Sequence, residues 1–375
     1  MGEKIWLSSP HMSGSEQKFI KQAFDTNWVA PLGPNVNEFE NSLQEYLGKD
    51  KYVAALSSGT AAIHLGLILL DIKPGDEVIC QSKTFSASAN PIVYLGATPI
   101  FVDSERDTWN LDPEQLEIAI KDRISKGQKP KAIIAVHLYG MPYKVQEINK
   151  IADYYEIPIL EDSAEALGSS YHGKKCGSFG DISILSFNGN KIITTSGGGA
   201  LIANSKEIKD KAVYLSTQAR GKAVEYHHTE IGYNYRMSNI VAGIGRGQMT
   251  VLDDHVKARR NNHQFYRKEL EGFTSIEFLD EDQGCYSNRW LTTILTESFE
   301  EREALRSAME KENIESRPLW KPMHMQPIFK SYPKYLNGIS EDLFHRGLCL
   351  PSGSNLTESD LSRVSSTIIN CLVNV

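Results

Sequence analysis

The segment Asp181–Gly199 has the sequence DISILSFNGNKIITTSGGG, and it decides how the rest of the chain is interpreted. Its first half alternates apolar and small residues up to Phe187, which predicts a β-strand. Its second half is polar and rich in glycine, which predicts a loop, and this loop carries Lys191. The next apolar run, Ala200–Ala203, follows too closely for a helix to intervene, so a turn should join two strands. The sequence therefore predicts a lysine held just beyond the end of a strand.

A second apolar run, Ile157–Leu160, leads into a carboxylate, Asp162, at another strand end. Asp162 and Lys191 lie 29 positions apart, which leaves room for one excursion and a return to the neighbouring strand. Taken singly, they are as well explained as a helix-capping aspartate and a solvated lysine. Together they suit pyridoxal phosphate (PLP), because the lysine forms a Schiff base and the acid keeps the pyridine nitrogen protonated.

Short apolar runs alternate with helical patterns from about residue 50 to 205, as they do in βα units. Several runs are almost wholly branched and apolar, as at 132–136, which is typical of strands buried on both faces of a mostly parallel sheet. One helix start is clear, because Asp112 can act as N-cap before Pro113. Seven strands are predicted, at Tyr52–Leu56, Glu77–Gln81, Pro99–Asp103, Ala132–His137, Pro158–Glu161, Ile182–Phe187 and Ala200–Ala203.

Helical, charged patterns dominate the chain after about residue 206. Weaker strands are expected there at Thr274–Leu279 and Arg289–Thr296. We therefore expect a large α/β domain over residues 1–250, which includes an irregular N-terminal segment. A smaller α+β domain is expected over residues 251–375.

Composition narrows the possible partners. The net charge is −7 and the basic residues are dispersed, which argues against a nucleic-acid surface. No apolar stretch approaches the length of a membrane span. The five cysteines are widely spaced without a CxxC pair, which predicts reduced thiols and neither a metal site nor disulfides. We expect a soluble, cytoplasmic protein without metal, membrane or nucleic-acid partners.

Three further parts of the sequence, with five residues in all, could serve a cofactor. Ser58, Gly59 and Thr60 form a polar turn between a strand and an alanine-rich helix, where amide groups and the helix dipole favour an anion such as phosphate. The turn matches neither the Walker nor the Rossmann pattern. Phe85 follows the next strand and could stack on a planar ring, and Ser186 could bond a phosphate. Each also has an ordinary interpretation as a helix cap, a core aromatic or a turn residue.

These motifs occur in an order that resembles one family over essentially the whole chain: the fold-type I, PLP-dependent sugar aminotransferases known as DegT/DnrJ/EryC1/StrS. The resemblance implies an aspartate aminotransferase-like fold and a homodimer with shared active sites. It also implies an amino-acid donor and a nucleotide-linked keto-sugar as substrates. The residues that carry it are the Ser58–Ala62 turn, Thr84-Phe85, Val136–Gly140, Glu161–Gly168, Ser186-Phe187, Lys191, Gly197–Gly199 and Gly232–Met237.

The resemblance assigns roles to individual residues. Lys191 looks like the catalytic lysine that carries PLP and shuttles a proton, and Asp162 like the partner of the pyridine nitrogen. Phe85 looks like the ring-stacking residue, with Ala164 on the opposite ring face. The remaining cofactor-binding candidates are Ser58, Gly59, Thr60 and Ser186 at the phosphate, Glu165, Asn188, and Asn234, which the neighbouring subunit would donate. The substrate candidates are His11, Arg220, Lys222, Arg317, Lys321 and His324.

One position departs from much of the family. Many relatives have Gln where this chain has Glu165, at the place that bonds the 3′-oxygen of the PLP ring. A carboxylate cannot donate unless it is protonated, and it repels a phenolate. We therefore predict that the pKa of Glu165 is raised and that its side chain stays protonated when PLP is bound.

The segments Ser186–Gly199 and Arg317–His324 resemble most closely the bacterial 4-aminotransferases of UDP-4-keto-6-deoxy-N-acetylglucosamine, which supply bacillosamine-type amino sugars. This implies transfer of an amino group from L-glutamate to C4 of such a sugar, for glycan or polysaccharide synthesis. Amination at C3 and a TDP- or GDP-linked sugar are the alternatives. The sequence does not decide between them, because the loops that determine which sugar binds show no recognisable pattern.

Other classes fit less well. PLP-dependent 3-dehydratases have His in place of Lys191, which disfavours that reaction. A PLP-fold transcriptional regulator would need a DNA-binding module or a basic face, and the sequence indicates neither. A nicotinamide-dependent enzyme would need the glycine fingerprint that this chain lacks.

Overall fold

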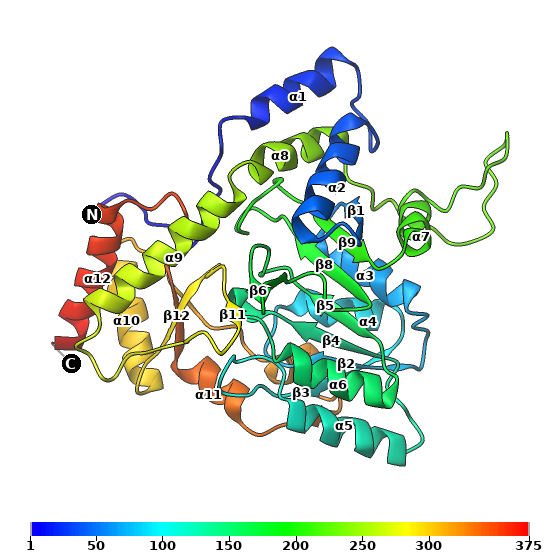
Figure 1. Ribbon diagram of the computed structural model, residues 1–375. Coiled ribbons are helices and arrows are strands. Elements are labelled where there is room, and N and C mark those ends of the chain that lie inside the picture. The colour runs from blue at the N-terminus through cyan, green and yellow to red at the C-terminus, as the bar shows by residue number, and fades with distance from the viewer. Residues whose placement is uncertain (1, 374–375) are drawn as a thin grey trace.

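The branched apolar runs of the sequence form one central sheet in the computed structural model, which describes residues 2–373 (Figure 1). All seven predicted strands are present, but the sheet has eight strands among the described residues. The additional strand comes from the C-terminal third and is too short to give a sequence pattern. In their order across the sheet, the strands are β1 (Tyr52–Leu56), β9 (Gly199–Ala203), β8 (Ile182–Ser186), β5 (Ile159–Asp162), β4 (Ala132–Val136), β2 (Glu77–Gln81), β3 (Thr98–Val102) and β14 (Lys334–Tyr335).

The sheet is mostly parallel, as predicted. The strands from β8 to β14 pair in parallel, whereas β9 runs antiparallel to both β1 and β8. Because β5 and β8 are parallel neighbours, their carboxyl ends lie at the same edge of the sheet, and Asp162 pairs in register with Ile184. The loop at 187–198 joins β8 to β9 at this edge, so Lys191 lies beside the end of β5, as the spacing predicted.

Helices cover both faces of this sheet, and alternate strand residues divide between two apolar clusters. Val78 and Cys80 pack with α3 (Gly59–Leu69) and α7 (Lys206–Ser216), while Ile79 packs with α5 (Pro113–Ser125) and α6 (Val145–Tyr155) on the other face. Asp112 caps α5 as expected, because its carboxylate accepts hydrogen bonds from two amides of the first turn. The elements of this half are α1 (Glu16–Asp25), α2 (Pro34–Leu47), α3 (Gly59–Leu69), η1 (Ser86–Ser88), α4 (Asn90–Tyr94), α5 (Pro113–Ser125), η2 (Leu138–Gly140), α6 (Val145–Tyr155), α7 (Lys206–Ser216) and α8 (Asn239–Met249).

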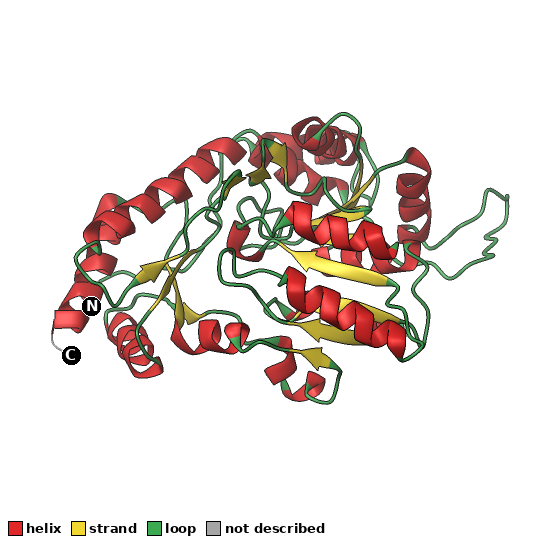
Figure 2. Cartoon of the chain, turned by 60° about the horizontal axis from the view of Figure 1, so that its bottom comes forward, coloured by secondary structure: helices red, strands yellow, loops and turns green. Residues whose placement is uncertain are grey.

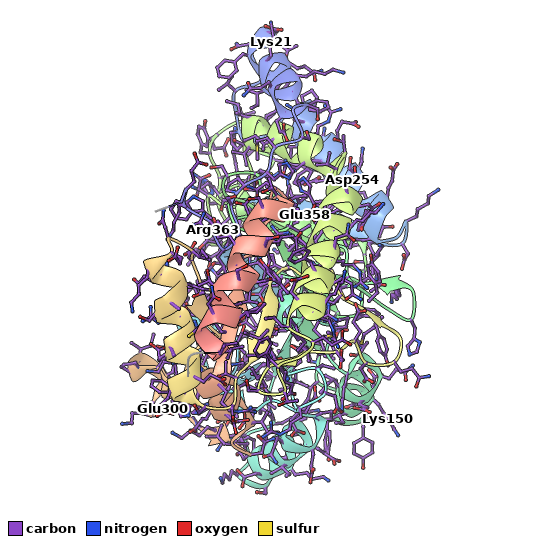
Figure 3. All side chains as sticks on the ribbon, turned by 90° about the vertical axis from the view of Figure 1, so that its left-hand side faces the viewer. Lys21, Lys150, Asp254, Glu300, Glu358 and Arg363 are labelled. Atoms are coloured by element: carbon purple, nitrogen blue, oxygen red, sulfur yellow. The ribbon has the colours of Figure 1, made fainter. Side chains whose placement is uncertain are left out.

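The C-terminal part contains a small antiparallel sheet with helices packed on it. Figure 3 shows α9 (Leu252–Glu269), α10 (Phe299–Lys311) and α12 (Glu358–Val373) side by side, and α12 contacts both of the others. The helical conformation is interrupted between α8 and α9, near the predicted boundary at residue 250. The division of the chain into two domains stays a prediction. The helical elements are α9 (Leu252–Glu269), α10 (Phe299–Lys311), η3 (Met323–Met325), η4 (Pro327–Phe329), α11 (Ile339–Arg346) and α12 (Glu358–Val373). The sheet strands are β10 (Glu277–Phe278), β12 (Thr292–Leu295), β15 (Gly347–Leu350) and β13 (Arg317–Pro318).

Two features lie outside these layers. A small third sheet combines β11 (Cys285–Tyr286), β6 (Ser170–Tyr171) and β7 (Lys174–Lys175), and so ties the C-terminal part to the segment after β5. A long loop between α7 and α8 projects away from the rest of the molecule (Figures 1 and 2). Over residues 2–373, no helix combines the length and apolar character needed to cross a membrane.

Candidate active site

A cavity of about 300 Å³ lies where β5 and β8 end and α3 begins. Its wall brings together ten of the eleven proposed cofactor-binding residues, from segments far apart in the sequence. They are Ser58, Gly59, Thr60, Phe85, Asp162, Ala164, Glu165, Ser186, Asn188 and Lys191. The eleventh, Asn234, is exposed near the base of the projecting loop.

Lys191 reaches this cavity from the loop between β8 and β9. The loop is anchored because the buried Phe187 accepts a backbone hydrogen bond from Thr195 (2.9 Å). The Lys191 Nζ lies 3.8 Å from a carboxylate oxygen of Glu165 and 4.1 Å from the centre of the Trp290 ring. Burial lowers the pKa of Lys191, although the charges of Glu165 and Asp162 act in the opposite direction. More of the amine is therefore neutral and nucleophilic than in an exposed lysine.

Asp162 presents a buried carboxylate to the same cavity. Ser88 donates a hydrogen bond to one oxygen (2.7 Å), and the amide of Ala164 donates to the other (3.1 Å). Burial raises the pKa of Asp162, and these two hydrogen bonds oppose the rise. A cationic nitrogen placed against Asp162 would compensate for burying its charge.

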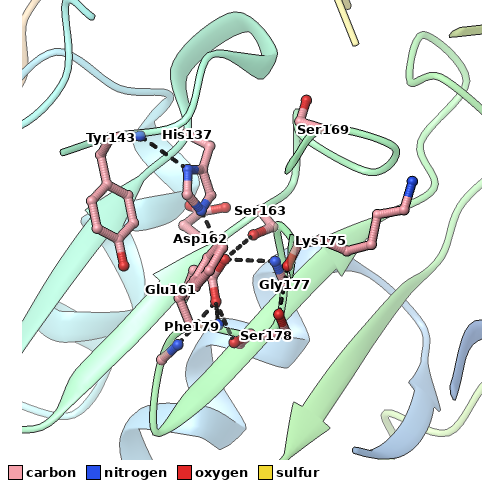
Figure 4. Close-up of polar contacts among 12 residues, drawn as sticks. His137, Tyr143, Glu161, Asp162, Ser163, Ser169, Lys175, Gly177, Ser178 and Phe179 are labelled. Carbon is pink, nitrogen blue, oxygen red and sulfur yellow. Dashed lines mark hydrogen bonds and ion pairs between the residues drawn. The ribbon is translucent and has the colours of Figure 1, made fainter. Parts of the chain in front are cut away.

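Glu161, the residue before Asp162 in β5, accepts a network of polar contacts (Figure 4). His137 accepts a hydrogen bond from the Tyr143 amide at Nδ1, so Nε2 carries the proton that His137 donates to Glu161 (2.7 Å). Burial acts to raise the pKa of Glu161, but the hydrogen bond from His137, with those from further donors, holds it at about 2. The other donors are the amides of Gly177, Phe179 and Gly180 and the hydroxyls of Ser163 and Ser183. This network fixes the backbone that carries Asp162.

Glu165 links three groups around the cavity. One of its oxygens accepts a hydrogen bond from the Tyr139 amide (2.6 Å), and the other accepts one from the Trp320 indole (3.2 Å) and faces Lys191. Burial raises the pKa of Glu165, while the charge of Lys191 acts to lower it. The net rise agrees with the direction predicted from the sequence. Protonation of Glu165 in the presence of PLP stays a prediction.

The start of α3 fits the phosphate of PLP. Ser58 caps the helix by accepting a hydrogen bond from the Ala61 amide (3.0 Å), and the Ala62 amide makes a bond back to the Ser58 carbonyl. The amides of Gly59 and Thr60 precede that bond and are available to an anion. A Cβ on residue 59 would lie 3.0 Å from the Cβ of Ser186, so glycine keeps this corner open. The cavity thus combines an anion site, a carboxylate and an amine, which are the groups that PLP requires.

Replacing Glu165 by Gln should stabilise the cofactor-free protein at about pH 8 and have much less effect near pH 4. The folded-state pKa of Glu165 lies above its ordinary value of 4.5. Below that value the carboxyl is protonated in both the folded and the unfolded protein. As the pH rises through the folded pKa, the wild-type protein loses stability because the unfolded state ionises more readily. Urea unfolding at both pH values measures this difference, and an effect that does not change with pH would contradict the raised pKa.

The six proposed substrate residues are dispersed and do not appear among the residues of the cavity wall. His11 stacks on His255 with ring centres 4.8 Å apart, and Arg317 pairs with Glu315 (2.9 Å). Arg220 and Lys222 are exposed on the projecting loop, with Arg220 over the Tyr226 ring, and Lys321 is half-buried. Roles for these residues in binding substrate stay predictions.

His324 is buried, with an ordinary structural environment. Its Nδ1 is 2.7 Å from the hydroxyl of Ser82, and its Nε2 is 3.0 Å from Glu341. These contacts join η3 to the end of β2 and the start of α11. A role of His324 in contacting the sugar stays a prediction as well.

Sequence reasoning missed two tryptophans and one serine at the site. Trp290 and Trp320 line the cavity from the C-terminal part of the chain, and Trp320 packs on Phe85 with ring centres 5.3 Å apart. Ser88 holds Asp162 in place. The tryptophans follow no local pattern that points to a cavity, whereas Ser88 lies in the polar segment after β2 and could have been proposed with Phe85.

Comparisons with known proteins agree with this geometry. Residues 10–369 match the model of the DegT/DnrJ/EryC1/StrS aminotransferase family. A Bacillus subtilis (strain 168) protein named as a pyridoxal phosphate-dependent aminotransferase, EpsN, is 50% identical over 99% of this chain and 96% of its own length. The GDP-perosamine synthase of Escherichia coli O157:H7 is 38% identical over 97% of each chain. The crystal structure of a DegT DnrJ EryC1 StrS aminotransferase from Brucella abortus superposes with a TM-score of 0.89 and 31% identity over 95% of each chain. The predicted fold and cofactor are confirmed: the chain belongs to the DegT/DnrJ/EryC1/StrS family of PLP-dependent aminotransferases, with the fold-type I architecture.

Proposed function

We propose that this nucleotide-sugar aminotransferase moves an amino group from L-glutamate to C4 of UDP-4-keto-6-deoxy-N-acetylglucosamine, to make an amino sugar of the bacillosamine type for a glycan or polysaccharide. The observation that carries the proposal is that Lys191 and Asp162 share one cavity. A lysine at position 191 supports amination over dehydration. The sequence of the Lys191 loop and of Arg317–His324 supports the UDP-linked 4-keto-sugar.

The residues of the cavity divide the chemistry among them. PLP bound there supplies an electron sink that makes the α-hydrogen of an amino acid acidic. The Lys191 amine would remove and return that proton, because it lines the same cavity and burial favours its neutral form. Asp162 would hold the pyridine nitrogen of bound PLP, and the start of α3 with Ser186 would hold its phosphate. Phe85 and Trp320 pack on each other and both line the cavity.

A GDP-linked sugar is the second candidate. The GDP-perosamine synthase of E. coli matches the chain over nearly its whole length, so its substrate class competes with the UDP-linked class. The two candidates share Lys191, Asp162 and the PLP phosphate site, and they differ in the groups that hold the nucleotide.

A two-step reaction separates the candidates. Glutamate is first added to the holoenzyme until the visible absorbance of PLP is lost, and excess glutamate is then removed. UDP-, TDP- and GDP-linked 4-keto-6-deoxy sugars and a UDP-linked 3-keto-sugar are added separately. The UDP-linked 4-keto-sugar should restore the absorbance fastest. Faster restoration by the GDP-linked sugar would support the second candidate, and no restoration by any keto-sugar would contradict both.

We also propose a homodimer with shared active sites. The projecting loop exposes Val224, Tyr226 and Ile231, whose exposed fractions are 102%, 77% and 82%. Apolar side chains displayed together on one projecting loop are typical of a contact surface. The same loop carries Asn234, which supports the proposal that the neighbouring subunit donates this residue to the active site.

We also propose a cytoplasmic location. The five cysteines are free thiols, which supports this location.

Mixing two inactive variants should restore activity. Lys191→Ala lacks the amine and Asn234→Ala lacks the residue donated in trans, so each homodimer should be strongly impaired. In a hybrid dimer, one site combines Lys191 of one chain with Asn234 of the other. Random exchange should therefore give about a quarter of the wild-type activity per site, because half of the dimers are hybrid. Failure of the exchanged mixture to exceed the two separate variants would contradict sharing.

A further inference from the structure

A second pocket lies along α9 and shares no lining residue with the active-site cavity among the described residues. Its volume is about 580 Å³, within the range of small-molecule sites. The lining is polar, and its three arginines outnumber its two carboxylates, which leaves one positive charge in excess. The lining residues are Arg260, Asn261, His263, Gln264, Arg267, Asp280, Glu281 and Arg289.

Arg289 is the arginine of this pocket that forms no ion pair with either of the two carboxylates in the lining. Arg260 pairs with Glu281 (2.5 Å) and Arg267 pairs with Asp280. Arg289 is only 7% exposed and donates to the carbonyl of Leu279 (2.7 Å), and in residues 2–373 it forms no ion pair with a carboxylate. Burial lowers the pKa of Arg289 to about 10. The charges of Glu281 and Asp280 act on Arg289 only from beyond ion-pair distance, and a buried guanidinium without an anion in contact is destabilising.

His263 lies in the same pocket with unused hydrogen-bonding groups. It is 5% exposed, and neither ring nitrogen has a hydrogen-bond partner within the described part of the chain. Buried polar groups are nearly always paired, so this histidine needs a partner from outside the chain. Burial and the neighbouring arginines lower the pKa of His263 to about 2, so its ring is neutral and offers one N–H donor.

We propose that this pocket binds a compact oxyanion, a phosphate group, with Arg289 and His263 as its main contacts and Arg260 and Arg267 beside it. A guanidinium presents two parallel N–H donors that match the oxygens of phosphate. Such a ligand would balance the charge of Arg289 and accept a hydrogen bond from the N–H group of His263. Arg289 precedes Trp290, whose ring covers Lys191, so a ligand in the pocket would contact the segment that forms one wall of the active site.

Titration calorimetry on the PLP-loaded enzyme tests the site, because bound PLP occupies the phosphate position at α3. Inorganic phosphate and uridine monophosphate are the two probes. We expect saturable binding of at least one of them, weakened about tenfold or more by Arg289→Gln. Tighter binding of the nucleotide, lost in Arg289→Gln, would identify a phosphate ester as the ligand. Equal binding of the two would identify free phosphate.

Two further variants make the test decisive. Arg267→Gln removes a cation from the rim of the pocket and should weaken binding even if Arg289→Gln fails to fold. Arg306→Gln is the matched control, because Arg306 is ion-paired on α10 outside the pocket and its loss should leave affinity unchanged. Absence of saturable binding, or equal affinity in the wild type and both pocket variants, would overturn the proposal.

Discussion

The Lys191→Ala enzyme should show a kcat at least about 1000-fold below that of the wild type while folding normally. The buried amine lies beside Glu165 and Trp290 in the cavity that fits PLP. If Lys191 has the roles proposed above, removal of the amine takes away both the covalent attachment of the cofactor and the group that moves the proton. Loss of the amine also removes the charge that faces Glu165, but burial favours the protonated, neutral form of that carboxyl, so the loss should fall on catalysis more than on folding. Single-turnover kinetics with glutamate and the visible spectrum of the cofactor measure the two effects separately.

The matched control is Lys330→Ala, because Lys330 is an exposed lysine and is absent from the cavity wall. Its kcat and cofactor spectrum should equal those of the wild type. A Lys191→Ala enzyme with wild-type turnover would contradict the assignment of Lys191. Exogenous amines such as methylamine should restore part of the proton transfer in Lys191→Ala, which a purely structural role of the lysine would not predict.

The Asp162→Asn enzyme should have a kcat lower by about 100-fold, because an amide cannot stabilise a protonated pyridine nitrogen by charge. The substitution keeps the shape of the side chain, and the Ala164 amide can still donate to its carbonyl oxygen. Stability should change little, since burial already disfavours the charged form of Asp162. Steady-state kinetics with glutamate and thermal unfolding of the holoenzyme measure the two quantities.

Ser88 gives a graded comparison for Asp162. Ser88→Ala removes one hydrogen bond to the carboxylate and should lower kcat by about tenfold. Ser86→Ala, in the same short turn but outside the cavity wall, should have no effect. Wild-type turnover of Asp162→Asn, or an equal loss in both serine variants, would show that the carboxylate does not act on the cofactor.

Local sequence patterns predicted the strands that form the site because each is a continuous apolar run. They also placed Lys191 beside Asp162, since the short distance between the two residues leaves adjacent parallel strands as the simplest path. β14 was missed because its two residues become a strand only by pairing with β3. Its position depends on how the C-terminal part folds back, which no local pattern shows.

The part of the site contributed by the C-terminal half could not be predicted for the same reason. Trp290 and Trp320 reach the cavity only through tertiary packing, and Trp320 is positioned by three bonds to distant residues. The Trp320 amide donates a hydrogen bond to the Tyr139 hydroxyl, and the Trp320 indole donates one to Glu165. The Lys83 amine donates a third to the Trp320 carbonyl. His324, in contrast, belongs to the family-like segment Arg317–His324, and in the structure it bridges Ser82 and Glu341.

Transfer of isotopic label tests most directly whether this enzyme moves an amino group to a sugar. The holoenzyme is incubated with ¹⁵N-glutamate and UDP-4-keto-6-deoxy-N-acetylglucosamine, and the nucleotide sugar is analysed by mass spectrometry and NMR. We predict one ¹⁵N atom attached at C4 of the sugar and an equal amount of the keto acid derived from glutamate. A nucleotide sugar that is consumed without gaining ¹⁵N, or that loses a hydroxyl group instead, would contradict an aminotransferase built on Lys191.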